Sequence, residues 1–214
     1  SLLRFVPYPI DLNINLDRVA KKFSRDHEVR SLCGPTISIQ ILSSFTAGYL
    51  IDHLVLMFAR RGFNADMRAV EYGKIATAIL DSKHELHRNP PDLFLIFPTH
   101  RDLMYCPGFG SNFDDSDAAV KKEIALWTKL WEQLPAPAVQ LSFSPPSDRP
   151  LADLDGFLPG GLTFHSRNVN LGLSKASTSS IALVDVEYLS FELGIINWDD
   201  PRTYNLCKQP FSMD

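Results

Sequence analysis

The stretch ILSSFTAGYL, residues 41–50, gathers several hydroxyl groups where a β-branched run meets a helical pattern. Ser44 is a candidate nucleophile, because free N–H groups at the start of a following helix stabilise an oxyanion. A serine nucleophile also needs a base, normally a histidine oriented by a carboxylate. The other interpretation is that Ser43, Ser44 and Thr46 cap the helix, since serine and threonine are favoured N-cap residues. The residue types leave both interpretations open.

A base for Ser44 has to come from another part of the chain. His100, in the segment PTHRDL, follows an apolar strand pattern. It is therefore the histidine expected near the end of a strand, and the alternative is an exposed loop histidine. The remaining histidines fall on expected helices or helix edges: His27, His53, His84, His87 and His165.

The elements that must position these groups alternate along the chain. Apolar residues at helical spacing predict a leading helix at residues 15–26, with Asn15 as its N-cap. Five strand patterns then alternate with helix patterns, and the segment 71–86 is either one helix or two short ones. Strands are expected at residues 35–44, 63–70, 91–99, 136–144 and 180–189, and the other helices at 46–62, 117–134 and 162–176.

Alternation at these lengths is typical of a parallel sheet, because parallel neighbours need helical crossovers. We expect an α/β protein: a three-layer α/β/α domain with a five-stranded parallel sheet and flavodoxin-like winding. Residues 1–34 are expected to form an N-terminal helical extension and residues 35–214 the α/β domain. The segments 106–117 and 197–214 stand outside the alternation.

In an open parallel sheet, ligands bind beyond the carboxyl ends of the strands, where helix N-termini also point. Arg101 and Arg202 are candidate ligands for an anion there, since guanidinium groups suit phosphate and carboxylate oxygens. The alternative for each is a surface ion pair, with Asp102 or Asp200. We call this edge of the sheet, beyond the carboxyl ends of the strands, the rim. The groups expected there are Ser43, Ser44, Thr46, Tyr72, Gly73, Thr99, His100, Arg101, Asp102, Ser142, Ser144, Glu187, Asp199, Asp200 and Arg202.

Composition excludes several function classes. A net charge of -4 and a pI near 5.8 provide no basic field for nucleic acid or an anionic membrane. The longest apolar run is far below the roughly 18 residues that span a bilayer. The three cysteines form no C-x-x-C pair, and His84 and His87 lack a third ligand at metal-site spacing. We expect a cytoplasmic protein without nucleic-acid or membrane partners, with no metal and no cofactor in this chain.

Several segments together resemble the N-terminal region of FkbH-like proteins. They are ILSSFTAGYL, the YG…ILD segment, PDLFLIFPTHRDL, LVDVEYLSFELG and the closing DPRTYNLCKQPFS, and the similarity covers residues 36–214. In that family, a domain similar to SGNH (GDSL-type) hydrolases precedes a phosphatase domain of HAD subfamily IIIC. The resemblance therefore implies an SGNH-hydrolase-like fold and a HAD phosphatase domain beyond residue 214. The D-x-D-x-T signature of that phosphatase does not occur in these 214 residues.

The resemblance also implies a function. FkbH-like proteins are associated with moving a glyceryl unit from a phosphorylated glycerate to an acyl carrier protein, in polyketide and related biosynthesis. The expected role is an accessory domain that binds a small anionic or carrier-linked substrate. Its expected partners are a HAD-type phosphatase or transferase domain and an acyl carrier protein.

Against the SGNH pattern, SFTAG resembles the S-I-T-A-G motif and places Ser44 at the nucleophile position. Gly73 is placed at the oxyanion glycine, and Thr99 or His100 lies where the family pattern has an asparagine. Asp200 represents the acid of the late D-x-x-H, whose histidine is replaced here. The hypotheses are a binding module without hydrolysis, an active serine esterase or acyltransferase using Ser44 and His100, and a structural dimerisation domain.

Overall fold

The computed structural model describes residues 16–212 of the chain. Helix α1 (Leu16–Arg25) and helix α2 (His27–Ser31) precede the first strand, as the leading helical pattern predicts. Asp26 caps α2, because its side chain accepts a hydrogen bond from the Val29 N–H. The predicted N-cap Asn15 lies outside the described residues.

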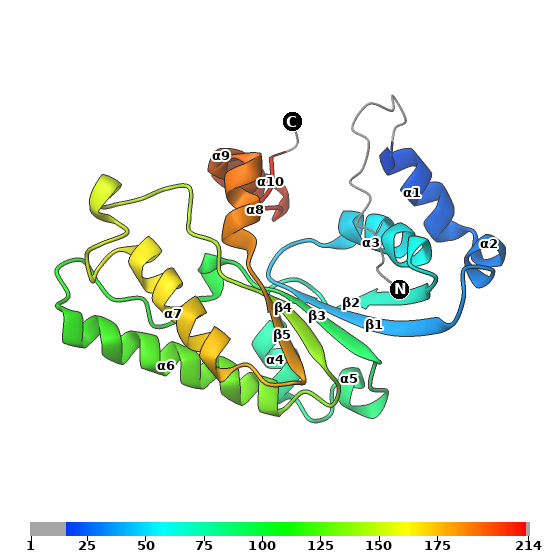
Figure 1. The fold of residues 1–214 in the computed structure, drawn as a ribbon, viewed down its shortest axis with the longest axis horizontal. Helices are drawn as coiled ribbons and strands as arrows, with labels where there is room; N and C mark the ends of the chain where they lie inside the picture. The colour runs from blue at the N-terminus through cyan, green and yellow to red at the C-terminus, as the bar shows by residue number, and fades with distance from the viewer. Residues whose placement is uncertain (1–15, 213–214) are drawn as a thin grey trace.

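The described residues form one sheet with the strand order β2-β1-β3-β4-β5, in which all neighbouring strands are parallel (Figure 1). This order is that of flavodoxin-like folds, so the predicted fold class and winding are confirmed. The strands are β1 (Thr36–Ser43), β2 (Asn64–Ala69), β3 (Leu93–Phe97), β4 (Ala138–Leu141) and β5 (Ile181–Val184).

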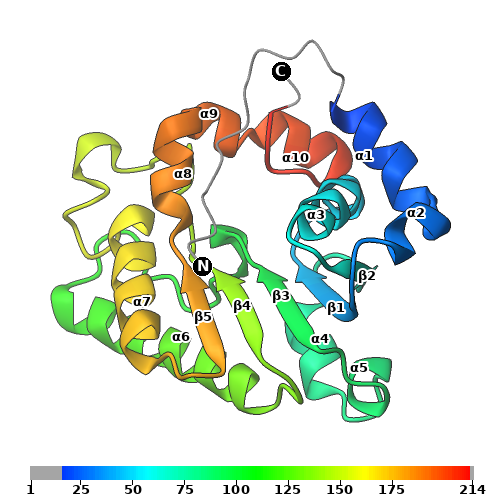
Figure 2. The ribbon, with the colours of Figure 1, turned by 45° about the vertical axis from the view of Figure 1, so that its right-hand side comes forward.

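Helices cover both faces of the sheet (Figure 2). One face packs against α3 (Gly48–Arg60), which α1 covers from outside. The opposite face packs mainly against α4, α6 and α7. The helices in the crossovers on that side are α4 (Ile75–Leu80), α5 (Glu85–Arg88), α6 (Phe113–Glu132) and α7 (Leu162–Ala176).

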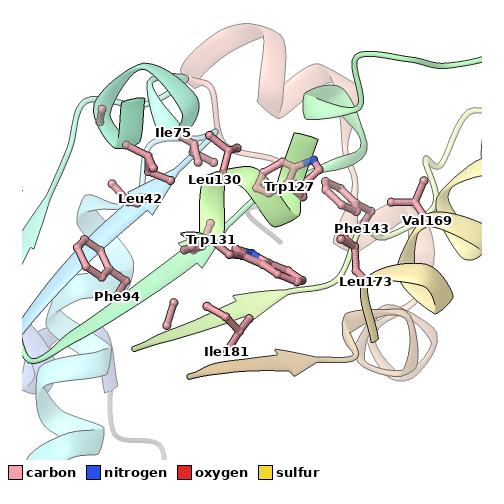
Figure 3. Packing of buried hydrophobic residues seen from close by; sticks show 14 of the residues in the cluster. Leu42, Ile75, Phe94, Trp127, Leu130, Trp131, Phe143, Val169, Leu173 and Ile181 are labelled. Carbon is pink, nitrogen blue, oxygen red and sulfur yellow. The ribbon is translucent and has the colours of Figure 1, made fainter. Parts of the chain in front are cut away.

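Two hydrophobic clusters separate these layers, because successive strand residues point to opposite faces. In β3, Leu95 joins the cluster under α3, whereas Phe94 and Ile96 join the cluster under α6 and α7. Figure 3 shows this second cluster, in which Trp127 and Trp131 pack against the sheet. Both tryptophans are buried in the core, and burying each large side chain contributes about 1.5–3 kcal/mol.

The fifth strand is shorter than predicted. It ends at Val184, and Asp185 then caps helix α8 (Val186–Leu193) by accepting a hydrogen bond from the Glu187 N–H at 2.9 Å. The expectation of a strand through residue 189 was wrong, because short apolar runs suit either structure and the aspartate cap favours a helix.

We call the segment after α8, residues 194–212, the tail. It forms two further short helices, α9 (Ile195–Trp198) and α10 (Pro201–Cys207). A proline at the start of α10 is favourable, because its missing N–H is not needed in the first turn. Two 3₁₀ turns, η1 (His100–Asp102) and η2 (Ala152–Leu154), follow β3 and β4. No helix within residues 16–212 is long and apolar enough to cross a membrane.

Candidate functional site

The strand order reverses between β1 and β3, and the segments that follow these two strands lie side by side. The Ser44 N–H donates to the Phe97 carbonyl at 3.2 Å. The Ser44 hydroxyl lies 3.3 Å from the same carbonyl oxygen and 3.4 Å from Thr99 Oγ1. Ser44 is only 5% exposed. The structure thus brings Ser44 and Thr99 together, as predicted for residues that follow the carboxyl ends of parallel strands.

Asp102 completes this network from η1. Its Oδ2 accepts a hydrogen bond from the Thr99 N–H at 2.7 Å and lies 3.4 Å from Thr99 Oγ1. Burial raises the pKa of the Asp102 carboxyl, although hydrogen bonds from Thr99 and the charge of Arg101 act in the opposite direction. Sequence reasoning assigned Asp102 no part in this network. The T-x-x-D spacing of Thr99 and Asp102 could have predicted this role, because residues at this spacing form a capping box, here around η1.

His100 lies in η1 and lines a small pocket together with Phe45, Trp198 and Phe211. Burial lowers the pKa of His100 to about 4; Asp199 opposes this change and Arg101 adds to it. Its Nδ1 atom is buried and has no hydrogen-bond partner in the described part of the chain. The ring is therefore neutral near pH 7. Within residues 16–212, no histidine is hydrogen-bonded to Ser44, whose partners are a carbonyl and a hydroxyl.

The hollow at the rim is closed by the tail. Phe211 packs edge-on against Phe45 at 5.5 Å and against Trp198 at 4.9 Å between ring centroids. The remaining pocket has a volume of about 20 Å³, which is roughly the space that one water molecule requires. The expected open crevice is thus filled by aromatic side chains in this structure. A larger pocket of about 430 Å³ lies at the opposite end of the sheet, against Trp131.

Arg101 is already paired. Its Nη1 lies 2.9 Å from Asp199 Oδ1, and its guanidinium lies over the Tyr204 ring, 4.1 Å from the ring centroid. Asp199 is buried, and its Oδ2 accepts hydrogen bonds from the N–H and hydroxyl of Ser147 at 2.9 and 3.1 Å. The ion-pair alternative for Arg101 is therefore realised, with Asp199 in place of Asp102.

Asp200 acts as the N-cap of α10. Its carboxylate accepts hydrogen bonds from the Arg202 N–H at 2.9 Å and the Thr203 hydroxyl at 2.8 Å. The Thr203 hydrogen bond is the main reason that the pKa of Asp200 is lowered. Asp200 does not line the rim pocket, whereas Asp199 does. Arg202 does not line this pocket either. Its Nε lies 3.3 Å from Asp200 Oδ1, so the ion-pair alternative is realised for Arg202 too, although its side chain is 85% exposed.

The segment after β2 contacts the end of β1. The Gly73 N–H donates to the Ser43 carbonyl at 3.0 Å, so the predicted oxyanion donor is used within the fold. Gly73 has a φ of +74°, a conformation that favours glycine. The Ser43 hydroxyl accepts a hydrogen bond from the Phe45 N–H at 3.1 Å, and Tyr72 is exposed.

Thr46 holds the tail rather than a helix end. Its hydroxyl donates to the Cys207 carbonyl at 3.2 Å, and its N–H donates to the Lys208 carbonyl at 2.9 Å. The N-cap of α3 is Ala47, which makes no side-chain cap hydrogen bond. The capping interpretation of Ser43, Ser44 and Thr46 was therefore wrong: the hydroxyls of Ser44 and Thr46 contact other segments, and that of Ser43 binds the Phe45 N–H, which precedes α3.

Glu123 of α6 supports the turn after β3, a role that sequence reasoning missed. It is fully buried, and its Oε2 accepts hydrogen bonds from the Met104 and Tyr105 N–H groups, both at 2.9 Å. Burial raises the pKa of Glu123. This role could have been suspected from the sequence, because Glu123 lies on the apolar side of a helix, four residues before Trp127.

Within the described residues, no group of three or more His, Cys, Asp or Glu side chains is arranged to hold a metal ion. His84 Nδ1 accepts a hydrogen bond from the Leu86 N–H. His87 Nε2 lies 2.8 Å from the Ile79 carbonyl. Both rings therefore serve the connection between α4 and α5.

The fold and the rim define a doubly wound α/β domain whose polar edge, at the switch between β1 and β3, is covered by its own tail. A family model described as FkbH, N-terminal domain, matches residues 38–214. The chain belongs to this family, and the resemblance found in the sequence is confirmed.

The chain is similar in structure to the N-terminal part of the protein BF1531 from Bacteroides fragilis, which contains a phosphatase domain and was crystallised with Mg. The two share 16% identity and a TM-score of 0.75, over 93% of this chain and 51% of that one. This likeness shows a shared fold, and the chain spans about half the length of that structure.

Two enzymes match more weakly. The acetyl xylan esterase AlAXEase has 14% identity and a TM-score of 0.44, covering 75% of this chain and 83% of its own. Phospholipase A1 from Streptomyces albidoflavus NA297 has 16% identity and a TM-score of 0.39, with 74% and 81% covered. A comparison with curated protein sequences found no significant match.

Proposed function

We propose that this chain is an accessory ligand-binding domain of an FkbH-type protein, working with a HAD-type phosphatase domain in polyketide or related biosynthesis. The observation that supports binding over hydrolysis is the set of partners around Ser44. Its hydroxyl is near a carbonyl and the Thr99 hydroxyl, and the half-buried carboxyl of Asp102 lies beyond. Within residues 16–212, the hydrogen bonds of this serine include no imidazole that would take its proton.

The proposed ligand is a small anion or the phosphate of a carrier-linked group, of the glyceryl or phosphoglycerate kind. Arg202 is the guanidinium that such a ligand reaches first, because most of its side chain is exposed. Arg101 is neutralised by Asp199, so it contributes to binding only as that pair rearranges. Guanidinium forks form paired hydrogen bonds with phosphate oxygens, which favours this ligand class.

Calorimetric titration of the full chain with 3-phosphoglycerate and with phosphopantetheine tests the proposal. Arg202→Ala is expected to weaken binding about tenfold or more, since a hydrogen bond to a charged group is worth about 1.5–3 kcal/mol. Arg88→Ala is the matched control, because Arg88 is exposed on α5 at the opposite end of the sheet. Absence of binding to both ligands, or wild-type affinity in Arg202→Ala, would refute this assignment.

A fluorophosphonate probe separates this proposal from the serine esterase or acyltransferase alternative. We expect no covalent labelling of the folded chain, because Ser44 is buried and no imidazole within residues 16–212 is bonded to it. Labelling that disappears in Ser44→Ala would favour the esterase instead.

The cysteines Cys33, Cys106 and Cys207 are free, which suits the cytoplasmic location that we propose.

A further inference from the structure

Helices α8 and α9 present an apolar face that the rest of the described chain leaves uncovered. Phe191 is 67% exposed and Ile196 is 69% exposed. The buried positions of α8 are Val186 and Ser190. We define the α8–α9 face as the exposed large apolar side chains of these helices: Tyr188, Leu189, Phe191, Leu193 and Ile196.

An ordinary surface helix exposes mainly polar side chains, whereas most of the exposed residues of α8 are apolar. In α8 the small polar Ser190 faces the domain, with its hydroxyl bonded to the Glu187 carbonyl, while aromatic and aliphatic side chains face outward. Glu192 is exposed among them and accepts a hydrogen bond from the Tyr188 hydroxyl at 2.8 Å. Several large apolar side chains gathered on one exposed segment mark an interaction site. A pocket of about 150 Å³ beside Phe191, lined also by Pro145, Arg149 and Ile195, adds a concave feature that a partner side chain can enter.

The path of the chain indicates what covers this face. The Ser212 N–H donates to the Asn197 carbonyl at 2.7 Å, so the last described residue is held on α9. Figure 1 shows α8, α9 and α10 grouped at one edge of the molecule. The family is described as an N-terminal domain, and the similar Bacteroides fragilis structure, about twice as long, contains a phosphatase domain. A domain that continues from this end therefore begins beside the α8–α9 face, at high effective concentration.

We propose that the α8–α9 face is the docking surface for the HAD-type phosphatase domain, an inference that rests on the proposed function. The inner side of α8 reaches the rim, because Val186 lines the same small pocket as His100. The Val186 N–H also donates to the Ser142 hydroxyl at 3.1 Å. A domain docked on the outer side lies about one helix diameter, roughly 10 Å, from the rim. This placement suits the transfer of a bound ligand between the two domains.

The test mixes the full chain with a separately produced HAD-type phosphatase domain of an FkbH protein from the same organism, and measures association by sedimentation velocity. We expect a one-to-one complex with the wild-type chain. Phe191→Asp and Ile196→Asp are each expected to weaken it at least tenfold. Leu80→Asp is the matched control, because Leu80 is 52% exposed at the end of α4, in the crossover between β2 and β3, and it is expected to bind like the wild type.

Three results would overturn the inference. They are the absence of a complex with the wild-type chain, wild-type affinity in Phe191→Asp, and self-association of the chain alone that Phe191→Asp abolishes. The last result would assign the face to a second copy of the chain. Titration of Phe191→Asp with 3-phosphoglycerate keeps the two proposals distinguishable, since its affinity is expected to match the wild type whether or not docking occurs.

Discussion

Arg101 and Asp199 form an ion pair across the closed rim, with 2.9 Å between Arg101 Nη1 and Asp199 Oδ1. Arg101 follows β3, whereas Asp199 belongs to the tail between α9 and α10. Because Asp199 also accepts two hydrogen bonds from Ser147, which follows β4, one carboxylate joins three segments. This pair therefore holds the tail over the carboxyl ends of the central strands.

Replacing Asp199 tests this role. Asp199→Ala leaves the Arg101 cation half-buried without its partner and removes the acceptor of Ser147. We expect the free energy of unfolding to fall by about 2–3 kcal/mol, below the 3–5 kcal/mol of a fully buried pair. Urea denaturation measures the change. Asp153→Ala, at an exposed position in η2, is the control, and an equal effect of both variants would contradict the assignment.

Phe211 is expected to keep the tail closed. Phe211→Ala removes the edge contacts with Phe45 and Trp198, so the tail should open more often. The expected loss is about 1–2 kcal/mol, since the ring is half-buried. Hydrogen exchange of residues 199–212 should accelerate, while Phe109→Ala, in an exposed loop, should leave it unchanged. Unaltered exchange in Phe211→Ala would show that the aromatic contacts do not hold the tail.

The buried His165 predicts a loss of stability in mild acid. Neither of its ring nitrogens has a hydrogen-bond partner among residues 16–212, and burial lowers its pKa to about 4. The unfolded chain, with a histidine pKa of about 6.5, therefore binds more protons between these values. The free energy of unfolding should fall as the pH decreases from about 6.5 towards 4.

His165→Phe isolates this contribution from that of His100, which has the same sign. The variant also separates the contribution of His165 from those of Asp102 and Glu123. Their raised pKa values favour the folded state at lower pH and so oppose the loss of stability in acid. Between pH 7 and pH 5, the variant should lose about 2 kcal/mol less than the wild type in urea denaturation. His27→Gln, exposed on α2, should follow the wild type. The same pH slope in both variants would argue against a neutral buried His165.

Gly161 is required by the close approach of two backbone segments. A Cβ atom at Gly161 would lie 2.0 Å from the Asp155 carbonyl oxygen, which accepts a hydrogen bond from the Phe164 N–H. Gly161→Ala is therefore expected to cost about 1–3 kcal/mol, because backbone has to move. Thermal unfolding measures the effect against Gly108→Ala, whose Cβ would meet nothing within 4 Å. Equal melting temperatures for the two variants would exclude this steric explanation.

The meeting of Ser44 and Thr99 could be predicted because the carboxyl ends of parallel strands share one edge of the sheet. The hydrogen-bond and ion-pair partners of the individual side chains at the rim could not be predicted. Asp199 and Asp200 are adjacent and chemically alike, yet only Asp199 reaches Arg101, while Asp200 caps α10. The helix after β5 was also missed, since its apolar residues fit a strand pattern equally well.

The sequence by itself determined the order of strands and helices, the parallel sheet and the family, because periodicity and chain order are local properties that survive without coordinates. Only the tertiary structure decided that the rim is closed and that Arg101 is neutralised. Both depend on the path by which the tail returns over the sheet and brings Phe211 and Asp199 to β1 and β3. Residue types in the tail do not specify that path, since its contacts are made with segments far away in the sequence.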